Sequence, residues 1–125
     1  MYFEDANYLY YVSGYYEGGN LQLTLDKKGR LTELEAHGIF QELRESVRYL
    51  QSVRVMHRDL KPQSILLTVD GHVKLANFQI MTQLKNKEER VLKTEGTPFY
   101  MSPEMIRGEP IGLDYDFYSI GVTLF

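Results

Sequence analysis

The sequence predicts an α+β fold within one domain, residues 1–125. Three observations predict it. An amphipathic helix pattern occupies the middle of the chain, two short strand patterns joined by a tight-turn signal follow it, and an aromatic run near the start is typical of a further strand. Neither an internal repeat nor a low-complexity tract interrupts this order.

The N-terminal part is expected to hold a strand and a short helix. Residues 8–12 are aromatic and β-branched, which is typical of a buried strand. The sequence Gly-Gly-Asn at residues 18–20 indicates a turn. A short helix is expected over residues 21–27, because Gly29 is a typical stop just beyond it.

The clearest helix begins after Thr32. Thr32 and Glu35 have the spacing of a capping box, in which each side chain accepts a hydrogen bond from the other residue's backbone N–H. Behind it, apolar residues recur every three or four positions: Ala36, Ile39, Phe40, Leu43, Val47 and Leu50. This stripe predicts a long helix with one buried face.

A hairpin, a loop and a last helix are expected in the second half. Strands over residues 64–69 and 72–77 flank Asp-Gly, a strong tight-turn signal. Residues 85–93 mix charges of both signs without an apolar period, which predicts an exposed loop. Apolar residues at helical spacing predict a helix from residue 114 to the end of the sequence.

Composition excludes several classes of function. The net charge of -3 gives no general attraction to nucleic acid or anionic membranes. The chain has no cysteine, which excludes disulfides, thiolate zinc sites and cysteine nucleophiles. The first residues do not resemble a secretion signal and no apolar run approaches membrane-spanning length, so we expect a cytoplasmic protein.

Four motifs lie in the loops and at the ends of these elements. They are His-Arg-Asp-Leu-Lys-Pro at 57–62, Asn-Phe-Gln at 77–79, Gly-Thr-Pro-Phe-Tyr-Met-Ser-Pro-Glu at 96–104 and Asp-Phe-Tyr-Ser-Ile-Gly at 116–121. In order and spacing they resemble the H-R-D-L-K-P-x-N, D-F-G, G-T-P-x-Y-x-[AS]-P-E and D-x-W-S-x-G motifs of eukaryotic serine/threonine protein kinases.

The resemblance covers the chain from end to end and is most specific to one branch. Residues 2–8, 82–85 and 96–104 resemble the polo-like kinases. The resemblance implies a protein-kinase-like fold, with a hinge strand and a mainly helical C-terminal lobe, truncated at both ends relative to the family domain.

The same resemblance implies a catalytic role for three residues. Asp59 would orient the substrate hydroxyl and accept its proton, Lys61 would steady the transferred phosphate, and Thr97 would brace both side chains. Asp116 would accept hydrogen bonds from backbone amides of the loop that carries Asp59.

Nucleotide-binding and regulatory residues are also implied. The adenine of ATP would lie against Leu66 and pair with the hinge backbone around Gly14, Tyr15 and Tyr16, and Ser13 stands at the gatekeeper position at the back of the pocket. Thr94 is a candidate phosphorylation site whose phosphate would pair with Arg58. The polo-like pattern instead aligns its phosphorylated threonine with Lys93, so this assignment and a merely exposed Thr94 both stay open.

Two departures affect the metal that the family uses. Ser64 stands where kinases have the asparagine that binds a second magnesium ion, and Asn77 replaces the aspartate of D-F-G. Magnesium is a hard cation that prefers anionic oxygens, so we expect its binding to be impaired. Gln79 replaces the glycine of the same motif and restricts the loop.

Three hypotheses follow. The chain is a pseudokinase that binds a protein partner or a nucleotide, an active serine/threonine kinase fragment that uses Asp59 and Lys61, or a degenerate gene duplicate without selected activity. We expect protein substrates or partners, no nucleic acid and no membrane, and leave the oligomeric state open. The resemblance adds the centriole or centrosome as a location. We also expect marginal stability, with exposed apolar faces on the long helix and the last helix.

Overall fold

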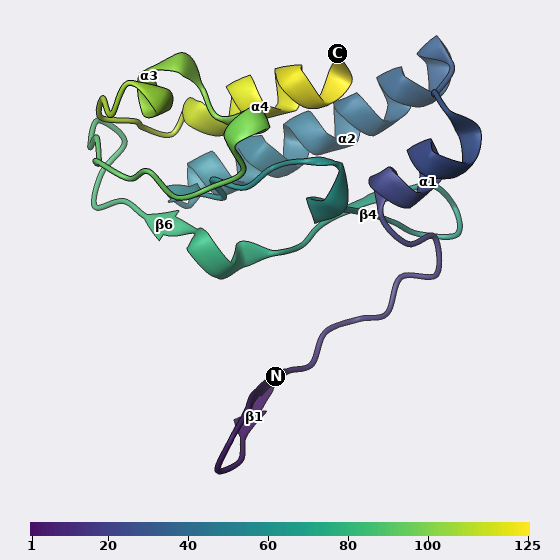
Figure 1. Cartoon of the computed structure of the whole chain (residues 1–125), viewed down its shortest axis with the longest axis horizontal. Coiled ribbons are helices and arrows are strands. Elements are labelled where there is room, and N and C mark those ends of the chain that lie inside the picture. The colour runs from purple at the N-terminus through teal and green to yellow at the C-terminus, as the bar shows by residue number, and fades with distance from the viewer.

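The computed structural model describes residues 1–125, and its layout follows the expected order of elements (Figure 1). The helices are α1 (Leu21–Lys28), α2 (Glu33–Ser52), α3 (Pro103–Ile106) and α4 (Tyr115–Leu124). The strands are β1 (Tyr2–Glu4), β2 (Leu9–Tyr11), β3 (Val55–Met56), β4 (Ile65–Leu67), β5 (Val73–Leu75) and β6 (Thr82–Gln83). Short 3-10 turns are η1 (Pro62–Ser64), η2 (Phe78–Ile80) and η3 (Pro98–Tyr100).

Three two-stranded antiparallel sheets accompany the helices: β1 pairs with β2, β3 with β6, and β4 with β5. The predicted hairpin is therefore confirmed as β4 and β5, which join at a turn where Gly71 has φ 84°. The α1 helix is confirmed too. Asn20 caps its start by accepting from the Leu23 N–H at 3.0 Å, and Gly29 ends it with φ 78°.

The long helix α2 starts at the predicted capping box. The Thr32 hydroxyl accepts from the Glu35 N–H at 3.2 Å, and the Glu35 carboxylate accepts from the Thr32 N–H at 2.9 Å. Leu43, Val47 and Leu50 of the predicted stripe are buried. The helix and its apolar face are therefore confirmed.

The expectation of exposed apolar faces on α2 and α4 is wrong for the inner faces of both helices. Val47 of α2 and Ile120 of α4 lie in one core cluster and are 0% and 1% exposed. The two helices run side by side (Figure 1), and α2 packs against β5 of the hairpin. The outer residues Leu34, Tyr118 and Leu124 do remain exposed.

A second core cluster lies around β3, β6 and α3. Its members are Met56, Leu84, Met105, Ile111, Leu113 and Tyr115. The loop predicted to be exposed, residues 85–93, returns to this cluster near its end, because the Val91 and Ile111 backbones exchange hydrogen bonds of 2.9 and 3.0 Å. Val91 is accordingly partly buried against the cluster. Residues 57–59, which carry part of the candidate site, lie in sequence between Met56 of this cluster and Leu60 of the first.

The N-terminal strand differs from its prediction. Residues 8–12 were expected to be buried, but β2 pairs only with β1, and every residue of both strands is exposed. The hairpin projects away from the body (Figure 1) and packs its aromatic rings on one another, with Phe3 and Tyr10 stacked at 4.8 Å. Aromatic content predicted the strand correctly but not its burial, because burial needs a second layer.

None of the helices combines the length and the apolar composition that crossing a bilayer requires.

Candidate functional site

The backbone of the loop after β3 is fixed by hydrogen bonds to a buried carboxylate. Asp116, at the start of α4, accepts hydrogen bonds from the backbone N–H of His57 at 2.7 Å and of Arg58 at 2.9 Å. Burial raises the pKa of Asp116 above its usual range, and the two N–H donors oppose that rise. The two bonds fix a backbone in which Arg58 adopts the left-handed conformation, with φ 69°.

His57 is a structural residue of this loop. Its Nε2 donates to the Ala76 carbonyl at 2.6 Å, and its Nδ1 accepts from the Asp59 N–H at 3.2 Å. These partners require a neutral ring protonated on Nε2. Burial lowers the pKa of His57, which favours the same neutral form. The ring also packs on Phe78, with centroids 4.6 Å apart.

The three predicted catalytic residues lie together, and we call them the Asp59 cluster: Asp59, Lys61 and Thr97. The Lys61 ammonium lies 2.8 Å from Asp59 Oδ2 and donates to Thr97 Oγ1 at 2.6 Å. Thr97 Oγ1 donates to Asp59 Oδ1 at 2.6 Å. Burial raises the pKa of Asp59, but the hydrogen bonds from Lys61 and Thr97 outweigh it and leave the pKa below its usual value.

This arrangement provides an ionised carboxylate at neutral pH. Asp59 is 16% exposed in its side chain and Lys61 is 21% exposed, so both groups remain accessible at one edge. A carboxylate with a free lone pair can accept a hydrogen bond from an approaching hydroxyl group. The ammonium beside it can hold an anion.

The two residues at the predicted metal positions, Ser64 and Asn77, carry no carboxylate. Ser64 is 0% exposed, and its hydroxyl donates to the Asp59 backbone carbonyl at 2.7 Å. Asn77 is exposed in the left-handed conformation, with φ 63°, and its amide nitrogen lies 3.4 Å from the Gln63 carbonyl. The Ser64 hydroxyl is buried against the protein, and Asn77 offers a neutral amide oxygen where the D-F-G motif has the anionic oxygen that magnesium prefers.

The predicted nucleotide-binding residues are only partly brought together. Ser13, Gly14 and Tyr15 are exposed in the segment that leads away to the N-terminal hairpin, whereas Tyr16 and Leu66 are half-buried. The turn at residues 18–20 joins this segment to β4, because the Leu67 N–H donates to the Gly19 carbonyl at 2.8 Å. A side chain at Gly18 would lie 2.3 Å from the Leu67 carbonyl oxygen, so this approach requires glycine.

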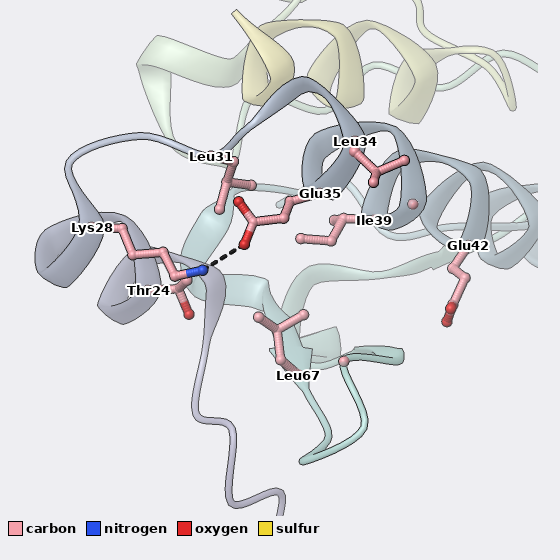
Figure 2. A pocket seen from close by; sticks show the side chains of 10 residues that line it. Thr24, Lys28, Leu31, Leu34, Glu35, Ile39, Glu42 and Leu67 are labelled. Atoms are coloured by element: carbon pink, nitrogen blue, oxygen red, sulfur yellow. Dashed lines mark hydrogen bonds and ion pairs between the residues drawn. The ribbon is translucent and has the colours of Figure 1, made fainter.

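A cavity of about 350 Å³ lies elsewhere, between α1, α2 and the β4–β5 turn. Figure 2 shows its lining, with Leu31, Ile39 and Leu67 facing the space and the Lys28–Glu35 ion pair of 2.5 Å at one end. It contains none of the predicted site residues. The sequence signal that could have indicated it is Gly38, which leaves a gap among the larger residues of α2.

Of the two predicted regulatory residues, Thr94 is exposed and Arg58 is buried. The sequence motifs did not single out Glu95, which follows Thr94 and pairs with Arg58. Glu95 accepts from Arg58 Nη2 at 2.6 Å. The available signal was a carboxylate immediately before the Gly-Thr-Pro motif.

Comparisons with known proteins agree with the motifs. The family described as protein kinase domain matches residues 1–125. Serine/threonine-protein kinase PLK4 of Drosophila virilis is 38% identical over 99% of this chain and 16% of the relative's length. PLK4 of Drosophila ananassae is 39% identical and PLK4 of Drosophila melanogaster 38%, with the same coverage. The chain thus spans about a sixth of the curated relatives it matches. It has the α+β fold of a protein kinase domain and belongs to the protein kinase family, with a resemblance to the serine/threonine kinase PLK4.

Proposed function

We propose that this chain is a serine/threonine kinase-like domain of polo-like type in which phosphoryl transfer is impaired, so that it acts as a binding module. One observation carries the proposal. The Ser64 hydroxyl at the second metal position is buried and donates to the Asp59 carbonyl, while a neutral amide replaces the D-F-G carboxylate at Asn77.

The physical reason is the charge that phosphoryl transfer develops. Protein kinases use ATP with magnesium ions, which bridge and neutralise the phosphate oxygens. The Ser64 hydroxyl is buried and donates to the Asp59 backbone carbonyl, so it braces the loop of residues 57–62, which we call the catalytic loop. A buried hydroxyl is not exposed to an incoming metal ion. Asn77 offers a neutral oxygen, which lacks the Coulomb attraction of a carboxylate for a divalent cation.

The remaining residues support binding and positioning. The Asp59 carboxylate is ionised and braced by Lys61 and Thr97, so it can accept a hydrogen bond from a serine or threonine hydroxyl of a protein partner. The same cluster favours the second candidate function, an active serine/threonine kinase fragment that uses Asp59 and Lys61 and holds its metal in an altered way. The third candidate, a duplicate without selected activity, predicts neither transfer nor binding.

Phosphoryl transfer from radiolabelled ATP to a generic protein substrate tests the proposal. We expect transfer at the level of the Asp59→Asn control, since removal of a catalytic base costs about 10²–10⁴-fold in an active enzyme. A double variant, Ser64→Asn with Asn77→Asp, restores both metal ligands and is expected to raise transfer above that control. Transfer by the unaltered chain that disappears in Asp59→Asn would establish the active-kinase candidate instead.

Nucleotide binding needs a separate measurement. We propose that ATP binds beside Leu66 without requiring magnesium, so ATP should raise the melting temperature equally with magnesium and with a chelator. The double variant should show a larger shift with magnesium. The absence of a shift under every condition would leave partner binding as the proposed activity.

The similarity to PLK4 also supports a proposal about where in the cell the protein acts. We propose a cytoplasmic location, with centriole or centrosome association on the strength of the similarity to PLK4. Fluorescent tagging of the chain in dividing cells tests the location.

A further inference from the structure

Arg58 brings a buried positive charge next to the Asp59 cluster. Its side chain is 2% exposed. Nε donates to the Ile80 carbonyl at 2.9 Å and Nη2 donates to the Glu95 carboxylate at 2.6 Å. Nη1 is buried without a hydrogen-bond partner. Since a buried guanidinium needs a counter-charge, Glu95 compensates this one through a direct ion pair, and the buried Asp116 carboxylate adds to it from nearby.

Glu95 connects Arg58 to the loop that carries Thr97. It lies two residues before Thr97, with Gly96 between them at φ 147°. A side chain at Gly96 would lie 3.1 Å from the Arg58 carbonyl oxygen, so the loop backbone passes close to the catalytic loop at this point. The loop therefore meets the catalytic loop twice within three residues, through the Glu95 ion pair and through the Thr97 hydroxyl.

We propose that Glu95 is a positioning residue of the candidate site, which holds the loop of residues 85–97 against Arg58 and so places Thr97 on Asp59 without phosphorylation of that loop. The inference rests on the Asp59 cluster of the proposed function, and it holds whether or not phosphate is transferred.

The contrast with Thr94 supports this assignment. The sequence suggested that a phosphate on Thr94 would supply the counter-charge for Arg58, but Thr94 is exposed and the neighbouring carboxylate already occupies a guanidinium donor. A phosphate would add roughly two further negative charges beside Glu95, where like charges repel. The loop accordingly has a permanent anion where a phosphorylated loop acquires one on modification.

Limited trypsin digestion of the 125-residue chain measures the loop directly, because Arg90 and Lys93 are exposed sites within it. Glu95→Gln keeps the size of the side chain and removes its charge. We expect cleavage after Lys93 to become about fivefold faster, which corresponds to losing roughly 1 kcal/mol from an ion pair exposed on one side. Glu95→Asp retains the charge and should restore part of the protection.

Two matched controls separate this effect from general changes in charge. Glu109→Gln removes another exposed carboxylate that pairs with an arginine, Arg107, at 2.7 Å, and should leave cleavage unchanged. Thr94→Ala removes the alternative regulatory group and should also leave cleavage unchanged. Far-ultraviolet circular dichroism confirms that each variant keeps its helices.

Positioning is tested by the backbone amide NMR signals of Asp59 in the same variants. Glu95→Gln should shift the Asp59 signal in the direction produced by Thr97→Val, which removes the hydroxyl contact itself, and Glu95→Asp should reverse the shift. The double variant Glu95→Gln, Thr97→Val should add no further shift.

Three results would each overturn the proposal: wild-type cleavage in Glu95→Gln, faster cleavage in Glu95→Gln without a shift of the Asp59 signal, or faster cleavage in Thr94→Ala. None of these results depends on phosphoryl transfer, so they are distinguishable from failure of the proposed function.

Discussion

Replacing Asp116 by alanine should destabilise the chain more than any exposed charge does. The change removes the acceptor for two backbone N–H groups, those of His57 at 2.7 Å and Arg58 at 2.9 Å, at a carboxylate only 1% exposed. An unpaired buried donor costs about 1–3 kcal/mol, so two donors cost roughly 2–6 kcal/mol. Burying the carboxylate has a free-energy cost of its own, which the raised pKa of Asp116 reflects, and the alanine variant removes that cost. We therefore expect a net loss of about 3 kcal/mol in the free energy of unfolding.

Urea unfolding followed by far-ultraviolet circular dichroism measures this free energy. Asp114→Ala is the matched control, because it removes an exposed carboxylate two residues earlier, which pairs with Arg90 at the surface. An exposed ion pair contributes about 0–1 kcal/mol, so the two variants should differ by about 2 kcal/mol or more. Equal unfolding free energies for Asp116→Ala and Asp114→Ala would refute the view that the catalytic loop is held through Asp116.

Three further predictions concern the core, the helix start and pH. Leu43→Ala removes a side chain that is 1% exposed and should cost about 2–5 kcal/mol by urea unfolding, whereas Leu34→Ala, 83% exposed, should change stability by about 0.5 kcal/mol or less. Thr32→Ala breaks the capping box and should lower the unfolding free energy by about 1 kcal/mol, with a shorter α2 by hydrogen exchange as the check. Burial lowers the folded pKa of His57 below its ordinary value of 6.5, so the unfolded chain binds a proton that the folded chain does not. Stability should therefore fall as pH decreases from 6.5 toward the folded pKa, and His57→Gln should flatten that part of the melting curve against pH.

Much of the fold was predictable because its signals are local. The capping box at Thr32, the stop at Gly29 and the Asp-Gly turn each depend on residues within a few positions of one another. The structure shows all three. The exposed N-terminal hairpin was not predictable in the same way, because an aromatic strand pattern has the same sequence whether or not a second layer covers it.

The candidate site also has a part that the sequence predicted and a part that it did not. The motifs predicted that Asp59, Lys61 and Thr97 would lie together, and the structure places them within hydrogen-bonding distance. The motifs did not reveal Glu95 as the partner of Arg58, because those residues are 37 positions apart and the pairing depends on the path of the loop between them.

The sequence alone determined the kinase family, the helices α1, α2 and α4, the β4–β5 hairpin and the replacement of both metal-binding residues, but not α3, β1, β3 or β6. Only the tertiary structure decided how those replacements are used. A serine at position 64 could leave its hydroxyl in solvent or bury it, and the structure buries it with its donated hydrogen bond at the Asp59 carbonyl, 2.7 Å away. The physical reason is that residue type sets which bonds a side chain can form, whereas burial and the position of distant backbone set which bonds it does form.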